Sequence, residues 1–108
     1  TLQEYLDKYL TKEEKKKSYI NASNIDLQSL ENDGHLINLK ELNIHSNELK
    51  SLKGIELIPN LEKLFIYDNP LEDISDLKDL KSLKYIYISK ESLSKKYHHF
   101  LNGFGSIN

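Results

Sequence analysis

The stretch that decides the fold runs from Leu39 to Ile88 and contains one apolar pattern twice in full and the start of a third copy. It reads LKELNIHSNELKSLKGIELIPN from Leu39, then LEKLFIYDNPLEDISDLKDLKS from Leu61, then LKYIYIS from Leu83. Each copy begins 22 residues after the previous one. A fixed period of this length indicates a chain built from stacked structural repeats.

Each copy changes its hydrophobic spacing once along its length. Residues 41–45 alternate polar and apolar side chains, with Leu42 and Ile44 as the apolar members, and residues 63–67 repeat this alternation. A period of two is typical of a half-buried strand. The spacing then becomes three, which favours a compact 3₁₀-like return path. The spaced residues are Leu49, Leu52, Ile55, Ile58 and Leu61, then Leu71, Ile74, Leu77, Leu80 and Leu83.

The pattern resembles the leucine-rich repeat, whose units carry L-x-x-L-x-L-x-x-N-x-L over about 20 to 29 residues. The nearest subclass is the 22-residue type of internalins and some phosphatase regulators. This resemblance implies an α/β fold, namely a short right-handed solenoid with a parallel strand from each unit on its concave face. It also implies a binding module without naming the partner. Because one unit cannot bury its apolar edge alone, stacked neighbours form the core.

Two asparagines occupy the equivalent position just past the strand of each full unit. Asn47 and Asn69 can each bond backbone groups that the sharp turn leaves unpaired, so we expect an asparagine ladder. A less complete unit covers residues 17–38, where Ile25 takes the ladder position and Asp33 interrupts the period of three. Glu91 takes the same position in the last unit, which limits the ladder to two rungs.

The two ends of the array carry helical spacing instead. Residues 1–10 place apolar side chains on one helix face, and we expect residues 1–16 to form an N-terminal cap, with partner binding by this helix as the alternative. Thr11 and Glu14 form a capping-box pattern for a second short helix. Residues 89–108 should form the C-terminal cap around Leu93, Tyr97 and Leu101. Residues 17–88 are the repeats of a single domain spanning 1–108.

The composition excludes several classes of function. The chain has 108 residues, no cysteine, no arginine, a net charge of −2 and no long apolar segment, so disulfides, thiolate chemistry, a membrane span and specific nucleic-acid reading are all disfavoured. The lack of cysteine fits a cytoplasmic location. The lack of methionine, even at position 1, suggests an excised piece, which leaves export or surface attachment as the alternative.

Function is expected on the polar side of the strands, where equivalent residues of stacked units lie about 4.8 Å apart. The 22-residue register predicts four columns. They are Tyr19, Glu41, Lys63 and Tyr85; Asn21, Asn43, Phe65 and Tyr87; Ser23, His45, Tyr67 and Ser89; and a looser one with Asn24, Ser46, Asp68 and Lys90.

These columns gather aromatic side chains on the second and third full strands. We expect the centre of a protein or peptide interface there, because aromatic residues dominate interface hot spots. The alternatives are that these residues only stabilise strand pairing or are covered by the cap helix. The predicted partner-binding residues are Phe65, Tyr67, Tyr85, Tyr87, Lys63, His45, Asp68 and Lys90.

Catalysis is the rival from another class. His45, Ser46 and Asp68 supply hydrolase-like residue types, but a flat exposed face lacks the enclosed pocket that such chemistry needs. No histidine pair has the i, i+4 spacing of a helical metal site, and we expect no catalytic residue, metal or cofactor. The sequence therefore predicts a non-enzymatic monomer, unless its aromatic patch self-associates, acting as an immunity-type inhibitor of an enzyme or as a regulatory scaffold.

Overall fold

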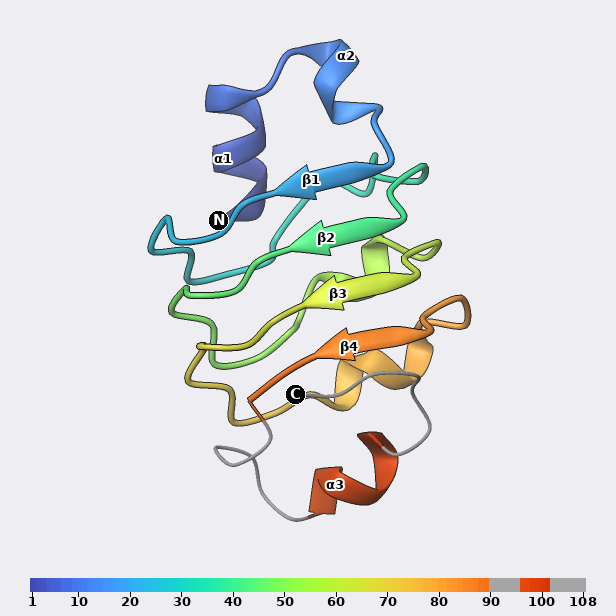
Figure 1. Ribbon diagram of the computed structural model, residues 1–108. Helices are drawn as coiled ribbons and strands as arrows, with labels where there is room; N and C mark the ends of the chain where they lie inside the picture. Colours follow the sequence, from blue (N-terminus) through green and yellow to red (C-terminus); the bar gives the residue numbers. More distant parts are fainter. Residues whose placement is uncertain (90–95, 102–108) are drawn as a thin grey trace.

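The chain coils into a solenoid whose front is a parallel sheet of four short strands (Figure 1). The computed structural model describes residues 1–89 and 96–101. The strands follow one another in sequence order, each parallel to the next. They are β1 (Tyr19–Asn21), β2 (Glu41–Asn43), β3 (Lys63–Phe65) and β4 (Tyr85–Tyr87).

The strands pair in the register that the repeat predicts. Leu42 pairs with Ile20 on one side and Leu64 on the other, and Leu64 pairs with Ile86. These central residues are buried, whereas their neighbours along each strand face outward. One slip by a residue would turn every leucine toward water, so the alternation itself fixes the register.

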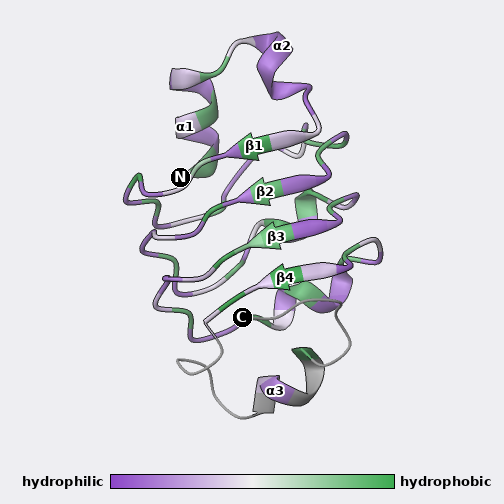
Figure 2. Cartoon of the chain, in the orientation of Figure 1, coloured by the Kyte–Doolittle hydropathy of each residue, from purple (hydrophilic) through white to green (hydrophobic). Residues whose placement is uncertain are grey.

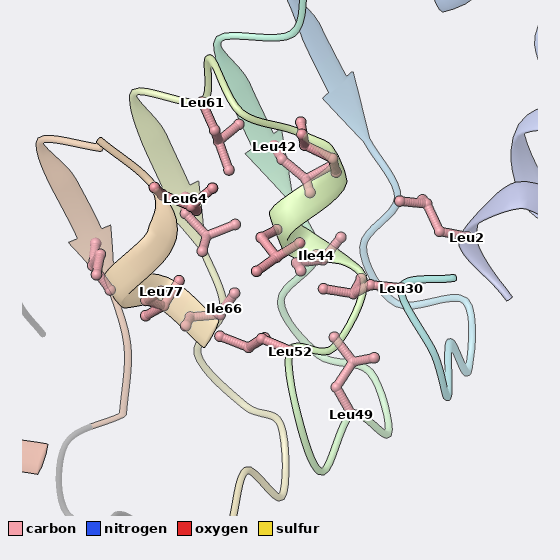
Figure 3. Packing of buried hydrophobic residues seen from close by; sticks show 14 of the residues in the cluster. Leu2, Leu30, Leu42, Ile44, Leu49, Leu52, Leu61, Leu64, Ile66 and Leu77 are labelled. Carbon is pink, nitrogen blue, oxygen red and sulfur yellow. The ribbon is translucent and has the colours of Figure 1, made fainter. Parts of the chain in front are cut away.

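The core lies between the sheet and the return paths behind it (Figures 2 and 3). Two 3₁₀ segments form part of these paths, η1 (Ile55–Leu57) and η2 (Ser75–Asp79), as the period of three predicts. Ile55 and Leu77 each turn inward from the segment that carries them. Each fully buried leucine or isoleucine contributes about 1.5–3 kcal/mol relative to an exposed one.

The asparagine ladder is present and joins successive coils. Asn47 is 4% exposed, and its Oδ1 accepts hydrogen bonds from the backbone N–H groups of Ile25 (3.0 Å) and Leu27 (2.9 Å) in the preceding coil. Its Nδ2 donates to the carbonyl oxygens of Ala22 (3.0 Å) and Ile44 (2.9 Å). Each rung therefore closes the turn of the coil before it as well as its own.

Asn69 repeats this arrangement one coil later. It accepts from the Leu49 N–H (3.1 Å) and donates to the carbonyls of Ile44 (3.0 Å) and Ile66 (3.1 Å). Asn47 and Asn69 thus both bond to backbone of the preceding coil. Because Ile25 takes the ladder position in the first coil, that coil has no ladder asparagine of its own. Asn47 of the next coil bonds to its turn instead.

Two helices cover the first coil. They are α1 (Leu2–Tyr9) and α2 (Lys12–Lys15). Leu2 and Leu6 enter the core, and the Leu2 N–H donates to the Ser29 carbonyl oxygen at 2.9 Å. The expected capping box of Thr11 and Glu14 starts α2. The helical spacing of residues 1–10 predicts Tyr9 on the apolar face, but Tyr9 is 60% exposed, because α1 ends there and the chain turns away.

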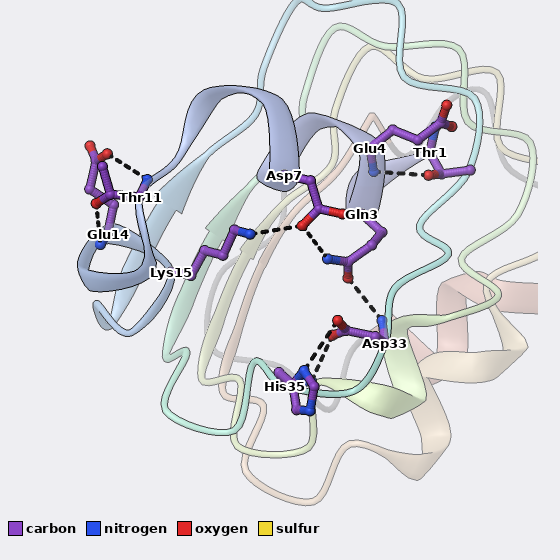
Figure 4. Close-up of polar contacts among 9 residues, drawn as sticks. All are labelled: Thr1, Gln3, Glu4, Asp7, Thr11, Glu14, Lys15, Asp33 and His35. Carbon is purple, nitrogen blue, oxygen red and sulfur yellow. Dashed lines mark hydrogen bonds and ion pairs between the residues drawn. The ribbon is translucent and has the colours of Figure 1, made fainter.

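Polar contacts fasten this cap to the first coil (Figure 4). Asp7 accepts from Lys15 Nζ at 2.7 Å and from Gln3 Nε2 at 2.9 Å, and Gln3 Oε1 accepts from the Asp33 N–H at 2.9 Å. The contact with Lys15 is the first cause of the lowered pKa of Asp7. The cap therefore bonds to the segment where Asp33 breaks the period of three.

The first coil contains a buried amide that the repeat pattern does not predict. The chain bends at Gly34, which adopts a positive φ of 80°. Asn32 is 8% exposed and donates to the carbonyl oxygens of Leu30 (2.8 Å) and Gly54 (3.1 Å). Asn32 is therefore a polar link between neighbouring coils that is separate from the ladder.

Helix α3 (Lys96–Leu101) stands at the other end of the array. Leu101 is buried, and the Tyr97 hydroxyl donates to Asp73 Oδ1 at 2.9 Å. Leu93 and Glu91 lie outside the described residues, so the boundary of the C-terminal cap and the division of the chain into caps and repeats stay predictions. Each helix within residues 1–89 and 96–101 is too short or too polar to cross a lipid bilayer.

Candidate protein-binding face

The strand face is defined here as the outward side chains of β1 to β4 together with the residue two positions after each strand. Backbone pairing places the side chains of one column side by side, as with Glu41 and Lys63 in one column and Phe65 and Tyr87 in the next. The face changes in character along the sheet. The β1 and β2 side carries the polar residues Asn21, Ser23 and Asn43 beside Tyr19, Glu41 and His45. Most of the aromatic rings lie on the β3 and β4 side.

Two stacked ring pairs form the centre of the aromatic side. The rings of Phe65 and Tyr87 lie nearly parallel, at 4° and with centroids 4.4 Å apart. The rings of His45 and Tyr67 stack in the neighbouring column at 7° and 4.3 Å. All four side chains are partly exposed, so neither pair is sunk in the core or fully covered by described residues. We call these four residues the aromatic patch.

Charged groups border the patch on the side where the strands begin. Lys63 Nζ lies 5.6 Å from the centroid of the Tyr85 ring and 3.9 Å from Glu41 Oε1. Tyr85 is 41% exposed. The Lys63 and Glu41 side chains are 38% and 35% exposed, so their ion pair contributes only about 0–1 kcal/mol to stability, and Lys63 can exchange Glu41 for a partner carboxylate at low cost.

The looser fourth column is not part of the strand face. Asn24, Ser46 and Asp68 all adopt positive φ values between 54° and 58°, which places them at the left-handed corner where the chain leaves the sheet. Asp68 is exposed there, and its N–H donates to Ser89 Oγ at 3.2 Å. Lys90, the fourth predicted member, lies outside the described residues. The pattern did not predict this corner, because none of the three is a glycine.

His45 and Ser46 make the one side-chain contact that the alternative function, a hydrolase, would require. His45 Nδ1 lies 2.8 Å from Ser46 Oγ. In residues 1–89 and 96–101, however, no carboxylate is bonded to His45, and no group of three metal-binding side chains is found. Hollows of 420 and 580 Å³ lie elsewhere, beside Gly54 and beside Tyr9. The strand face is open, which suits a macromolecular surface better than a small substrate.

Comparison with known proteins agrees with the architecture. Residues 59–96 match the family model described as Leucine Rich repeats (2 copies). The chain has a leucine-rich-repeat fold. No curated protein is similar enough in sequence to be matched. The 22-residue subclass of internalins and phosphatase regulators stays a prediction.

A solved structure shows the same fold. The crystal structure of the Drosophila melanogaster SNF/U2A' complex contains a chain that superposes with a TM-score of 0.68 at 23% sequence identity. The alignment covers 86% of this chain and 60% of that one, so this chain spans less than two thirds of its structural neighbour.

Proposed function

We propose that this leucine-rich-repeat chain binds another protein through its strand face, with the aromatic patch at the centre of the contact. The observation that carries the proposal is the stacked, partly exposed pair of Phe65 and Tyr87 beside the stacked pair of His45 and Tyr67. Rigid rings held in place by their neighbours lose little side-chain entropy on binding, and such residues supply most hot-spot energy.

The solved neighbour supports this direction, since it was crystallised as a complex. The finer role is part of the proposal: the occupied face blocks an enzyme partner or positions a regulatory one. Catalysis is not proposed, because a reaction needs an oriented base and an enclosed site, and the His45 to Ser46 contact offers neither.

The test compares partner capture by wild type and by Phe65→Ala/Tyr87→Ala. Removing a hot-spot pair should cost about 2 kcal/mol or more, which is a roughly 30-fold loss of affinity for the captured protein. Tyr9→Ala is the control, since Tyr9 lies on α1, outside the strand face, and is 60% exposed. Circular dichroism checks that all variants fold.

Equal capture of the same protein by the wild type and the double variant would show that the patch is not the site. Where the captured protein is an enzyme, its activity is measured with one equivalent of this chain. Loss of activity identifies the inhibitor role, and retained activity identifies the scaffold role.

A further inference from the structure

The strand face lies between two rims of opposite charge, and these rims indicate the chemistry of the partner. Figure 1 shows all strand starts along one side of the sheet and all strand ends along the other. The three residues before each strand, at 16–18, 38–40, 60–62 and 82–84, contain four lysines and one glutamate. We call this side the basic rim.

The opposite side has the reverse balance. The segments that begin at the left-handed corners, at 24–28, 46–50 and 68–72, contain four acidic residues and one lysine. Asp26, Glu48, Asp68 and Glu72 are all exposed. We call this side the acidic rim. Lys90, outside the described residues, is not counted in it.

Most of these charges are available to a partner. On the basic rim, Lys84 is exposed and makes no ion pair within the described chain, and Lys40 meets Glu62 only at 3.6 Å. On the acidic rim, the carboxylates of Asp26, Glu48 and Asp68 make no ion pair among residues 1–89 and 96–101. Exposed ion pairs such as Lys40 with Glu62 are weak, so Lys40 can leave Glu62 to bind a partner.

One unit contributes one segment to each rim, and the charge of each rim is the sum over these segments. The strand face separates the rims by about six residues, or roughly 20 Å at 3.3 Å per residue. That span equals an extended peptide of about six residues or an α-helix of about 13 residues. The aromatic patch lies between them.

We propose that the partner presents a peptide segment with an apolar or aromatic middle, an acidic group at one end and a basic group at the other. The acidic end lies over the basic rim near Lys84, and the basic end lies over the acidic rim near Asp68. This inference rests on the proposed function and adds the orientation of the partner, because complementary rim charges fix register and accelerate association more than they raise affinity.

The experiment selects binders from a random peptide library displayed on phage, using the whole chain as bait and peptides long enough to cross the strand face. Enriched peptides should share an apolar middle with oppositely charged ends. A synthetic peptide from the largest enriched group is then measured by stopped-flow against Lys40→Glu/Lys84→Glu. Its association rate constant should fall about tenfold at low salt, and the difference should shrink at high salt.

Two further variants complete the design. Lys78→Glu changes an exposed lysine on η2, away from the strand face, and should leave the association rate within about twofold of wild type. Exchanging both rims, with Glu48→Lys/Asp68→Lys added to the double lysine variant, should transfer the preference to a peptide whose charged ends are exchanged.

Each remaining result counts against one claim. Enriched peptides that need Phe65 but lack opposite charges at their ends overturn the orientation and leave the proposed function standing. Peptides that bind Phe65→Ala as well as wild type overturn the proposed function itself. Recovery of no enriched peptide, or equal effects of Lys78→Glu and the rim variant, also overturns the inference.

Discussion

Replacing Asn47 with alanine should destabilise the fold more than any other single asparagine substitution in the repeats. The change leaves the buried Leu27 N–H and the Ala22 carbonyl without their asparagine partner, and it also removes the bond to the more exposed Ile25 N–H. The Ile44 carbonyl keeps a bond from Asn69. At roughly 1–3 kcal/mol for each buried group left unpaired, we expect a loss of about 3–4 kcal/mol.

This loss is large against the total of about 5–15 kcal/mol expected for a domain of this size. Urea unfolding followed by circular dichroism measures it as a lower midpoint at unchanged slope. Asn69→Ala should cost less, because Asn69 Oδ1 accepts from Leu49 alone, and Asn43→Ala on the strand face should cost under ~0.5 kcal/mol. A loss for Asn47→Ala below about 1 kcal/mol, or equal to that of the control, would refute the ladder reasoning.

Three further substitutions test other parts of the fold. Gly54→Ala should lower the free energy of unfolding by over ~2 kcal/mol in urea melts, because the added Cβ would stand 2.6 Å from the Leu30 carbonyl oxygen and the residue has a φ of 105°. Gly34→Ala should lower it by only about 1 kcal/mol, because its Cβ would meet nothing within 4 Å. Equal losses for the two variants would contradict this reasoning. Burial first, and nearby acidic groups second, raise the pKa of Asp76, so its ionisation opposes folding as pH rises above 3.8. Asp76→Asn should therefore be more stable near neutral pH, by up to ~0.5 kcal/mol, with the gain absent below the ordinary pKa. Thr11→Ala should cost about 1 kcal/mol, seen as faster amide hydrogen exchange in α2, and unchanged exchange would count against the cap.

The repeat period made the sheet and the ladder predictable. Residues that are 22 positions apart lie side by side on neighbouring strands, as Leu42 does with Leu64 and Phe65 with Tyr87. Hydrophobic burial enforces that register, so the sequence was enough to find the neighbours in each column. The stacking of His45 on Tyr67 follows from the same column, although its near-parallel geometry does not.

The period places equivalent positions side by side, but it does not predict the conformation or the contacts of each residue. Asn32 lies one period before Gly54, so the register brings the two positions together, but it does not predict that the Asn32 amide is buried and bonded to the Gly54 carbonyl. The left-handed corners at Ser46 and Asp68 depend on how the backbone leaves the sheet, and neither residue type requires a positive φ. Tyr9 fits the helical face by spacing but faces water, since α1 stops at that residue.

For the predicted partner-binding residues, the structure gives the positions and not the role. The structure shows that Phe65, Tyr67, Tyr87 and His45 lie together and partly exposed, with Lys63 and Tyr85 beside them and Asp68 at the corner. Their role in binding stays a prediction, because side-chain arrangement limits what can bind without identifying it. The rim charges became visible only once the strand ends were located.

The backward reach of Asn47 has a consequence for synthesis on the ribosome. The turn at Ile25 is closed by an amide 22 residues further along the chain, so this coil cannot complete its bonds while it is the newest one made. Each such turn waits for its successor to emerge. A nascent chain that stalls, or a gene that is shortened from its 3′ end, would therefore leave a last coil that has all its residues but lacks the asparagine bonds to its turn.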